Sequence, residues 1–104
     1  MATHSEHNIQ NEIRLFCGQQ DIPCFRCNVG KIRLPSGGYF DTGLPPGFSD
    51  LIILYNRTIY FCECKTATGR QREDQIRFQK YIESHGYIYF IARSIDDVKK
   101  ILNL

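Results

Sequence analysis

Three charged residues stand at positions where the sequence is otherwise apolar. Glu63 and Lys65 interrupt the run FCECK, residues 61–65, and Asp50 directly precedes the run LIILY, residues 51–55. A carboxylate in a buried strand is costly unless it has a partner. These residues are therefore the first candidates for a functional site.

The two apolar runs predict an antiparallel pair of strands, residues 51–55 and 59–64. If residues 56–57 form a two-residue turn, the ladder places Asp50 opposite Glu63. Opposed residues in such a pair share a face, with Cβ atoms about 4.5–5.5 Å apart. Two carboxylates would then converge at one point. Because Asn-Arg is not the best sequence for this turn, a loop that is one residue longer stays open.

Like charges that directly oppose one another destabilise a sheet, so this pair makes most sense with a divalent cation between its members. Oxygen-only ligation by Asp50 and Glu63 favours Mg²⁺ or Mn²⁺ over zinc. Strand alternation places Lys65 on the face of Glu63 and Cys62 and Cys64 on the opposite face. The structural alternative is that Asp50 caps a loop and that Glu63 and Lys65 form a solvated salt bridge.

The N-terminal segment predicts a helix that brings a further carboxylate toward the core. Apolar residues recur at helical spacing from Ile9 to Cys17, and Thr3-x-x-Glu6 has the form of a capping box. On a helical wheel Glu6 lies near the apolar stripe, so its side chain points inward or along the edge of the core.

The remaining elements follow from periodicity and turn residues. The Gly- and Pro-rich segment 42–49 is typical of loops that set up a site. The other predicted elements are a short strand over 23–28, a hairpin over 31–40 at the edge of the sheet, a helix over 71–85, a strand over 87–92, and a last helix over 95–102 capped by Ser94-x-x-Asp97.

Strands that are apolar on both faces indicate a sheet covered by helices on both sides. The predicted fold class is α/β (α+β), with a central mixed sheet flanked by helices on both faces and the order α-β-β-β-β-α-β-α. A chain of 104 residues, 42% hydrophobic and 23% charged, is expected to form one globular domain over residues 1–104.

The formal net charge of +2 does not by itself indicate nucleic acid, but the basic residues are unevenly distributed. The segment 65–80 is rich in Lys and Arg and is a candidate phosphate-facing surface, although a solvated helix face explains it equally well. The N-terminus has no apolar signal-peptide core, and no run approaches membrane-spanning length. We therefore expect a cytoplasmic protein without membrane contact.

Five cysteines, an odd number, argue against a closed disulfide framework. Cys24 and Cys27 form a C-x-x-C and Cys62 and Cys64 a C-x-C, which allows a four-thiolate zinc site. The second pair lies in a strand-like run, where a free cysteine commonly packs as a small hydrophobe. A zinc-stabilised module stays open as an alternative.

The ordered set of motifs resembles the PD-(D/E)XK nuclease superfamily and, more narrowly, its VRR-NUC family. The resemblance runs from Glu6 to the C-terminal helix. Its motifs are E-x-x-I-Q from Glu6 to Gln10, R-x-N-x-G from Arg26 to Gly30, GLPPGFSD ending at Asp50, E-x-K from Glu63 to Lys65, and Gln75. Ser49 stands where the family has proline, and Cys64 where an aliphatic residue is commoner.

The resemblance implies a restriction-endonuclease-like core and metal-dependent hydrolysis of DNA phosphodiesters with Mg²⁺ or Mn²⁺. The implied ligands are Asp50, Glu63 and the backbone carbonyl of Cys64. Glu6 would be an outer-sphere or second-metal ligand.

Two further side chains receive roles from the same resemblance. Lys65 would position or help to deprotonate the attacking water and stabilise negative charge. Gln75 would orient water or phosphate, whereas without the resemblance it would be assigned to an exposed helix surface.

The expected substrate is DNA read by shape. No recognition helix or aromatic stacking ladder is evident, which favours structure-selective cleavage. Stand-alone domains of this minimal size in the family, from phages and bacteria, act as homodimers on four-way junctions, which implies a Holliday-junction resolvase. A flap or single-strand nuclease of replication and repair, and a non-catalytic DNA-binding module, are the alternatives. The expected DNA-binding residues are Arg70, Arg72, Arg77, Lys80, Asn28 and Lys31.

Overall fold

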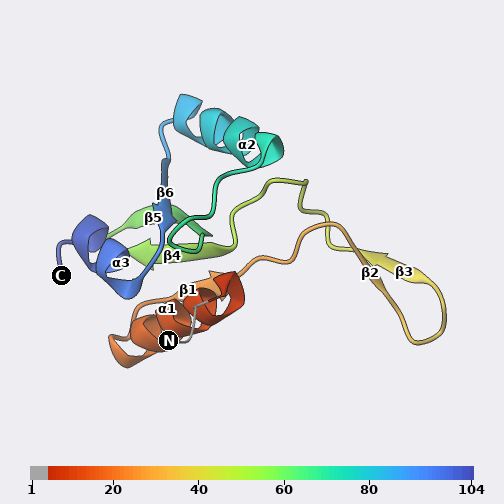
Figure 1. The fold of residues 1–104 in the computed structure, drawn as a ribbon, viewed down its shortest axis with the longest axis horizontal. Helices are drawn as coiled ribbons and strands as arrows, with labels where there is room; N and C mark the ends of the chain where they lie inside the picture. Colours follow the sequence, from red (N-terminus) through yellow and green to blue (C-terminus); the bar gives the residue numbers. More distant parts are fainter. Residues whose placement is uncertain (1–4) are drawn as a thin grey trace.

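The computed structural model describes residues 5–104, which form three helices and six strands (Figure 1). No helix within this part of the chain combines the length and the apolar character needed to span a membrane. In chain order the elements are α1 (Glu6–Gln19), β1 (Cys24–Arg26), β2 (Lys31–Arg33), β3 (Tyr39–Asp41), β4 (Leu51–Tyr55), β5 (Thr58–Cys64), α2 (Glu73–Ser84), β6 (Ile88–Ala92) and α3 (Ile95–Leu102).

Four strands form the central sheet in the order β1-β4-β5-β6. The first two pairs are antiparallel and the last pair is parallel, so the predicted mixed sheet is confirmed. Asn56 and Arg57 have φ values of 52° and 61°. Two consecutive positive φ angles are what a type I′ turn requires. The predicted two-residue turn is therefore confirmed, and the ladder places Leu51 opposite Cys62 as predicted.

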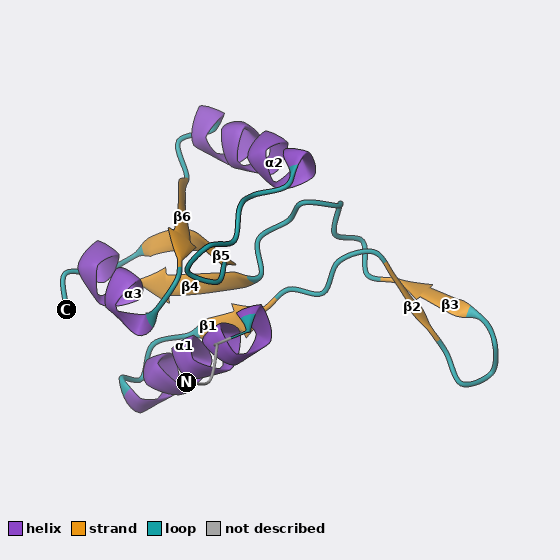
Figure 2. Ribbon diagram, viewed as in Figure 1, coloured by secondary structure: helices purple, strands orange, loops and turns teal. Residues whose placement is uncertain are grey.

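Helices cover both faces of this sheet, as predicted. In Figure 2, α1 and α3 lie on one side of the sheet and α2 on the other. The larger core cluster joins α1 and α3 to one sheet face, and Ile13, Leu51 and Val98 are fully buried within it. A smaller cluster packs α2 on the other face through Phe78 and Ile82.

The β2–β3 hairpin departs from the prediction, because it forms a separate two-stranded sheet instead of the edge of the central one. Figure 1 shows it projecting away from the body of the molecule. Its hydrogen bonds are made within the hairpin and at its base, where the Thr42 N–H donates to the carbonyl of Gly30 at 2.9 Å. Five strands precede α2, one more than the predicted element order contains.

The N-termini of α1 and α3 differ in detail from the predicted caps. The hydroxyl of Ser5 caps α1 by accepting a backbone N–H three residues on, at 3.1 Å. Thr3, the first residue of the predicted capping box, lies outside the described residues. Ser94 is the N-cap residue of α3, but its side chain makes no capping bond. Instead the carboxylate of Asp97 accepts from the N–H of Arg93 at 2.8 Å.

The glycine-rich loop before β4 approaches the start of α2 closely at Gly47. Gly47 has a φ of +87°, and a Cβ atom there would lie 2.2 Å from the carbonyl oxygen of Asp74. Both the backbone conformation and the close approach exclude a side chain at this position. The loop that leads to Asp50 therefore packs directly against the helix that carries Gln75.

We expect Gly47→Ala to lower the free energy of unfolding by about 2–4 kcal/mol, because left-handed strain adds to a backbone clash. Urea denaturation measures the loss. Gly43→Ala is the matched control, since Gly43 has a φ of +82° and open space around its Cβ position. The control carries only the strain of about 1–2 kcal/mol. An equal loss in both variants would show that the contact with Asp74 is unimportant.

Candidate active site

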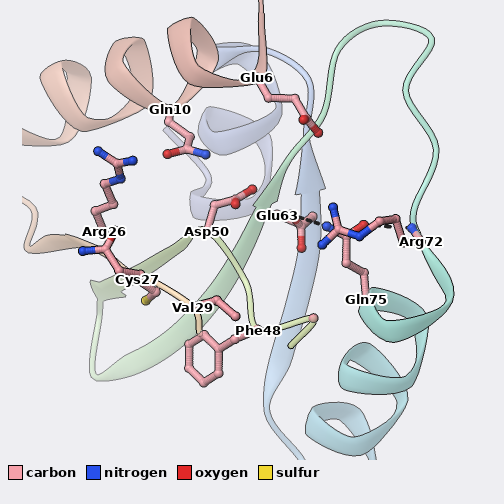
Figure 3. A pocket seen from close by; sticks show the side chains of 12 residues that line it. Glu6, Gln10, Arg26, Cys27, Val29, Phe48, Asp50, Glu63, Arg72 and Gln75 are labelled. Atoms are coloured by element: carbon pink, nitrogen blue, oxygen red, sulfur yellow. Dashed lines mark hydrogen bonds between the residues drawn. The ribbon is translucent and has the colours of Figure 1, made fainter. Parts of the chain in front are cut away.

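A pocket of about 260 Å³ opens where β4 begins and β5 ends. Its walls come from α1, the segment after β1, the glycine-rich loop and the start of α2 (Figure 3). Both carboxylates of the predicted pair, Asp50 and Glu63, line it. Segments that are far apart in the sequence thus meet around two acidic side chains.

Asp50 connects the start of β4 to β5 and to the segment after β1 through hydrogen bonds. Its carboxylate accepts the backbone N–H of Cys64 at 2.8 Å, and its carbonyl accepts the N–H of Cys27 at 2.8 Å. The Lys65 N–H donates to Ala92 in β6 at 3.1 Å. Because N–H and C=O point in opposite directions across a trans peptide, the Cys64 carbonyl faces the side of Asp50. The predicted backbone ligand therefore lies on the same side of β5 as Asp50.

Glu63 is the most deeply buried acid of the pocket, with 1% of its surface exposed. One carboxyl oxygen accepts from Gln75 Nε2 at 3.1 Å and the other from the Tyr89 hydroxyl at 3.2 Å. Burial and the neighbouring Asp50 raise the pKa of Glu63 to about 9. Without a cation the carboxyl group therefore keeps its proton at neutral pH.

Lys65 reaches the pocket through a partner on α1. Its ammonium lies 3.2 Å from the carboxylate of Glu6, and the residue is 4% exposed. Glu6 lines the pocket, whereas Lys65 does not. The alternative of a solvated Glu63–Lys65 salt bridge is wrong, because both side chains are buried and Lys65 pairs with Glu6. Glu6 itself is exposed, with 47% of its side-chain surface accessible, so it lies at the rim of the pocket rather than inside the core.

Gln75 is buried and belongs to the pocket, so its assignment to an exposed helix surface is wrong. Its carbonyl oxygen accepts the backbone N–H of Arg72 at 2.9 Å, and its NH₂ group donates to Glu63. Both ends of the amide are engaged. Gln75 therefore contacts the carboxylate of Glu63 directly, and its role in orienting water or phosphate stays a prediction.

The predicted DNA-binding residues are not gathered at one place. Arg72 and Asn28 line the pocket. Arg77 lies 4.0 Å from Glu73 on an exposed face of α2, and Lys31 belongs to the projecting hairpin (Figure 1). The remaining two, Arg70 and Lys80, are exposed outside the pocket lining.

Cys17, Cys24, Cys62 and Cys64 lie close together in the core, where Cys17 pairs with Cys24 and Cys62 with Cys64, but Cys27 stands apart from them. Cys62 and Cys64 are fully buried in the core on the α1 side of the sheet, whereas Cys27 lies in the pocket beside Asp50. Within residues 5–104 no group of three or more His, Cys, Asp or Glu side chains is arranged to hold a metal ion. A four-thiolate zinc site has no geometric basis here.

Comparison with known proteins identifies the fold. A solved structure described as a VRR_NUC domain matches with a TM-score of 0.68, covering 96% of this chain and 97% of that chain at 16% sequence identity. This chain has the VRR_NUC fold. No protein-family model and no curated protein sequence matches it. The likeness is thus one of three-dimensional structure, and it bears out the fold expected from the motifs.

Within this VRR_NUC fold the pocket contains two of the motif residues, Arg26 and Gln10, to which the resemblance had assigned no role. Arg26 extends from the end of β1 and Gln10 from α1, on the pocket wall across from Arg72 (Figure 3). Gln10 lies one helical turn beyond Glu6, a spacing that signals a shared face. Tyr89 had no such signal, because it stands in an apolar strand and reaches Glu63 only through the parallel pairing of β6 with β5.

Arg93, the residue that follows β6, holds the loop after β5 in place. Arg93 Nη1 donates to the carbonyl oxygens of Thr66 and Gly69, at 2.5 Å and 2.8 Å. These bonds order the segment between Lys65 and the basic residues that follow it. The loop is therefore anchored to the same sheet that carries the acids.

The donor set of the pocket fits a hard divalent cation. Asp50 and Glu63 offer carboxylate oxygens, and the Cys64 carbonyl faces the same side, which is oxygen ligation of the kind that Mg²⁺ and Mn²⁺ prefer. Burial raises the pKa of Glu63 first, and repulsion by the neighbouring Asp50 adds to the effect. A cation between them would remove that repulsion.

Proposed function

We propose that this chain is a metal-dependent endodeoxyribonuclease that hydrolyses phosphodiester bonds. The observation that carries the proposal is the convergence of Asp50 and Glu63 in one pocket, with the Lys65–Glu6 ion pair at its wall. Held by Asp50, Glu63 and the Cys64 carbonyl, Mg²⁺ or Mn²⁺ would polarise a scissile phosphate and lower the pKa of bound water.

The chain's own side chains would do the rest. The buried ammonium of Lys65 would stabilise negative charge on the phosphate and position the attacking water. Glu6, already paired with Lys65 at 3.2 Å, would hold that ammonium in place and lie in the outer sphere of the cation. Arg72 at the pocket rim would bind the DNA backbone, which positions a strand without reading its sequence.

The proposed substrate is branched DNA, with a four-way junction first among the candidates. A junction has two strands to cut symmetrically, and one chain of this fold offers one such pocket. A homodimer in the cytoplasm of a bacterial cell would supply the second site. The VRR_NUC fold supports a nuclease-type domain that acts on DNA.

Cleavage of end-labelled DNA tests the proposal directly. Four-way junction, flap, single-stranded and duplex DNA are each incubated with the protein and Mg²⁺, Mn²⁺ or EDTA. We expect paired symmetric nicks in the junction that disappear with EDTA, and a dimer by sedimentation. Cleavage confined to flap or single-stranded DNA would contradict the junction assignment and retain the nuclease. If no DNA is cut with either metal, the nuclease proposal fails.

A further inference from the structure

The carboxyl group of Glu63 is held from two sides by hydrogen-bond donors. Gln75 Nε2 lies 3.1 Å from one oxygen and the Tyr89 hydroxyl lies 3.2 Å from the other. All three residues are buried. A carboxyl group with both oxygens engaged cannot rotate without losing a hydrogen bond, so its plane is fixed before any cation binds.

The side-chain amide of Gln75 can adopt only one orientation here. The backbone N–H of Arg72 can only donate, and it donates to Gln75 Oε1 at 2.9 Å. The NH₂ group of Gln75 is thereby turned toward Glu63. The start of α2 thus sets the direction of the first donor.

Hydrogen bonding also fixes the direction of the Tyr89 hydroxyl group. The NH₂ group of Gln71 donates to Gln79 Oε1 at 2.9 Å and to the Tyr89 oxygen at 3.1 Å. An amide NH₂ cannot accept, so the Tyr89 oxygen accepts a hydrogen bond from Gln71 and its own O–H donates to Glu63. A chain of three hydrogen bonds therefore runs from α2 to the acid.

From this geometry we infer that Tyr89, oriented by Gln71, is a positioning residue that holds Glu63 in its cation-binding orientation. The inference rests on the proposed function, because it presumes that Glu63 binds a divalent cation. Loss of outer partners of a metal ligand typically costs 10–100-fold in metal affinity. Tyr89 reaches the site through its hydrogen bond to Glu63 and does not line the pocket, so its loss is expected to change metal binding rather than DNA binding.

The test compares Tyr89→Phe with Tyr87→Phe in the full chain. Tyr87 is half exposed and its ring packs on Phe61 in the same region, so its variant controls for loss of a hydroxyl. Isothermal titration with Mn²⁺ in the absence of DNA gives the metal affinity, and thermal unfolding reports the fold. We expect Tyr89→Phe to bind Mn²⁺ about tenfold or more weakly and Tyr87→Phe to match the wild type.

Junction cleavage as a function of Mn²⁺ concentration gives a second readout. Cleavage by Tyr89→Phe should recover as Mn²⁺ is raised, which a merely structural defect would not show. Unchanged Mn²⁺ affinity in Tyr89→Phe, or a cleavage loss that no concentration of Mn²⁺ restores, would overturn the inference.

A second variant covers the case in which Tyr89→Phe does not fold. Gln71→Ala leaves the tyrosine ring in place and removes only the group that orients its hydroxyl, so we expect Mn²⁺ binding to weaken roughly threefold or more. Wild-type affinity in a folded Gln71→Ala protein would count against the inference. A wild-type chain that neither binds Mn²⁺ nor cuts DNA would instead refute the proposed function.

Discussion

Asp50→Asn will lower the rate of metal-dependent DNA cleavage by about 10²–10³-fold or more, while the protein stays folded and keeps its affinity for DNA. Metal-ion catalysis contributes several kcal/mol of transition-state stabilisation, and each 1.4 kcal/mol is about a factor of ten in rate. The substitution removes a charged ligand of the proposed cation. The new amide can still present an oxygen to the N–H of Cys64, which Asp50 accepts at 2.8 Å.

Single-turnover cleavage of the junction with Mg²⁺ measures this effect, and fluorescence anisotropy with Ca²⁺ measures DNA affinity. Asp96→Asn is the matched control, since Asp96 makes the same charge change at an exposed position on α3. If Asp50→Asn cut DNA at the wild-type rate, the activity would come from another site or from a contaminant.

The second large effect concerns the stability of the metal-free protein as a function of pH. The pKa of Glu63 rises from 4.5 to about 9 on folding, because the group is buried beside Asp50. Between these values the folded chain keeps the proton and the unfolded chain releases it. Stability therefore falls as pH rises, by about 1.4 kcal/mol for each pH unit. The contribution is present in full below pH 4.5 and lost by about pH 9.

Glu63→Gln removes this titration and keeps the shape of the side chain. We expect the stability of Glu63→Gln relative to the wild type to increase by about 4 kcal/mol between pH 5 and pH 8. Urea denaturation in EDTA measures it, and adding Mn²⁺ at pH 8 should stabilise the wild type more than the variant.

Glu73→Gln serves as the control for a change of one acidic group, because its side chain is 94% exposed. Its stability difference from the wild type should vary little over the same pH range. Parallel pH profiles for Glu63→Gln and the wild type would mean that Glu63 is already ionised in the metal-free folded chain.

Local sequence patterns determined the acidic pair. A two-residue turn at Asn56 and Arg57 and the strict alternation of strands together specify which residues oppose one another, so the register that brings Asp50 toward Glu63 is set within residues 50–63. The same alternation places Cys64 in the core on the opposite face. The mixed sheet with helices on both faces followed from the apolar pattern and from the resemblance of the motifs to VRR-NUC domains.

Only the tertiary structure decided what surrounds that pair. The partner of Lys65 is Glu6 on α1, and the second donor to Glu63 is Tyr89, which lies 26 positions further along the chain. Neither contact has a local period that reveals it, because each depends on how a helix or a parallel strand packs onto the sheet. The β2–β3 hairpin lies outside the central sheet for a similar reason. The edge beside β4 is occupied by β1, so β2 and β3 pair with each other. Strand register is a local property of this sequence, whereas the environment of its buried acids is a property of the packed fold.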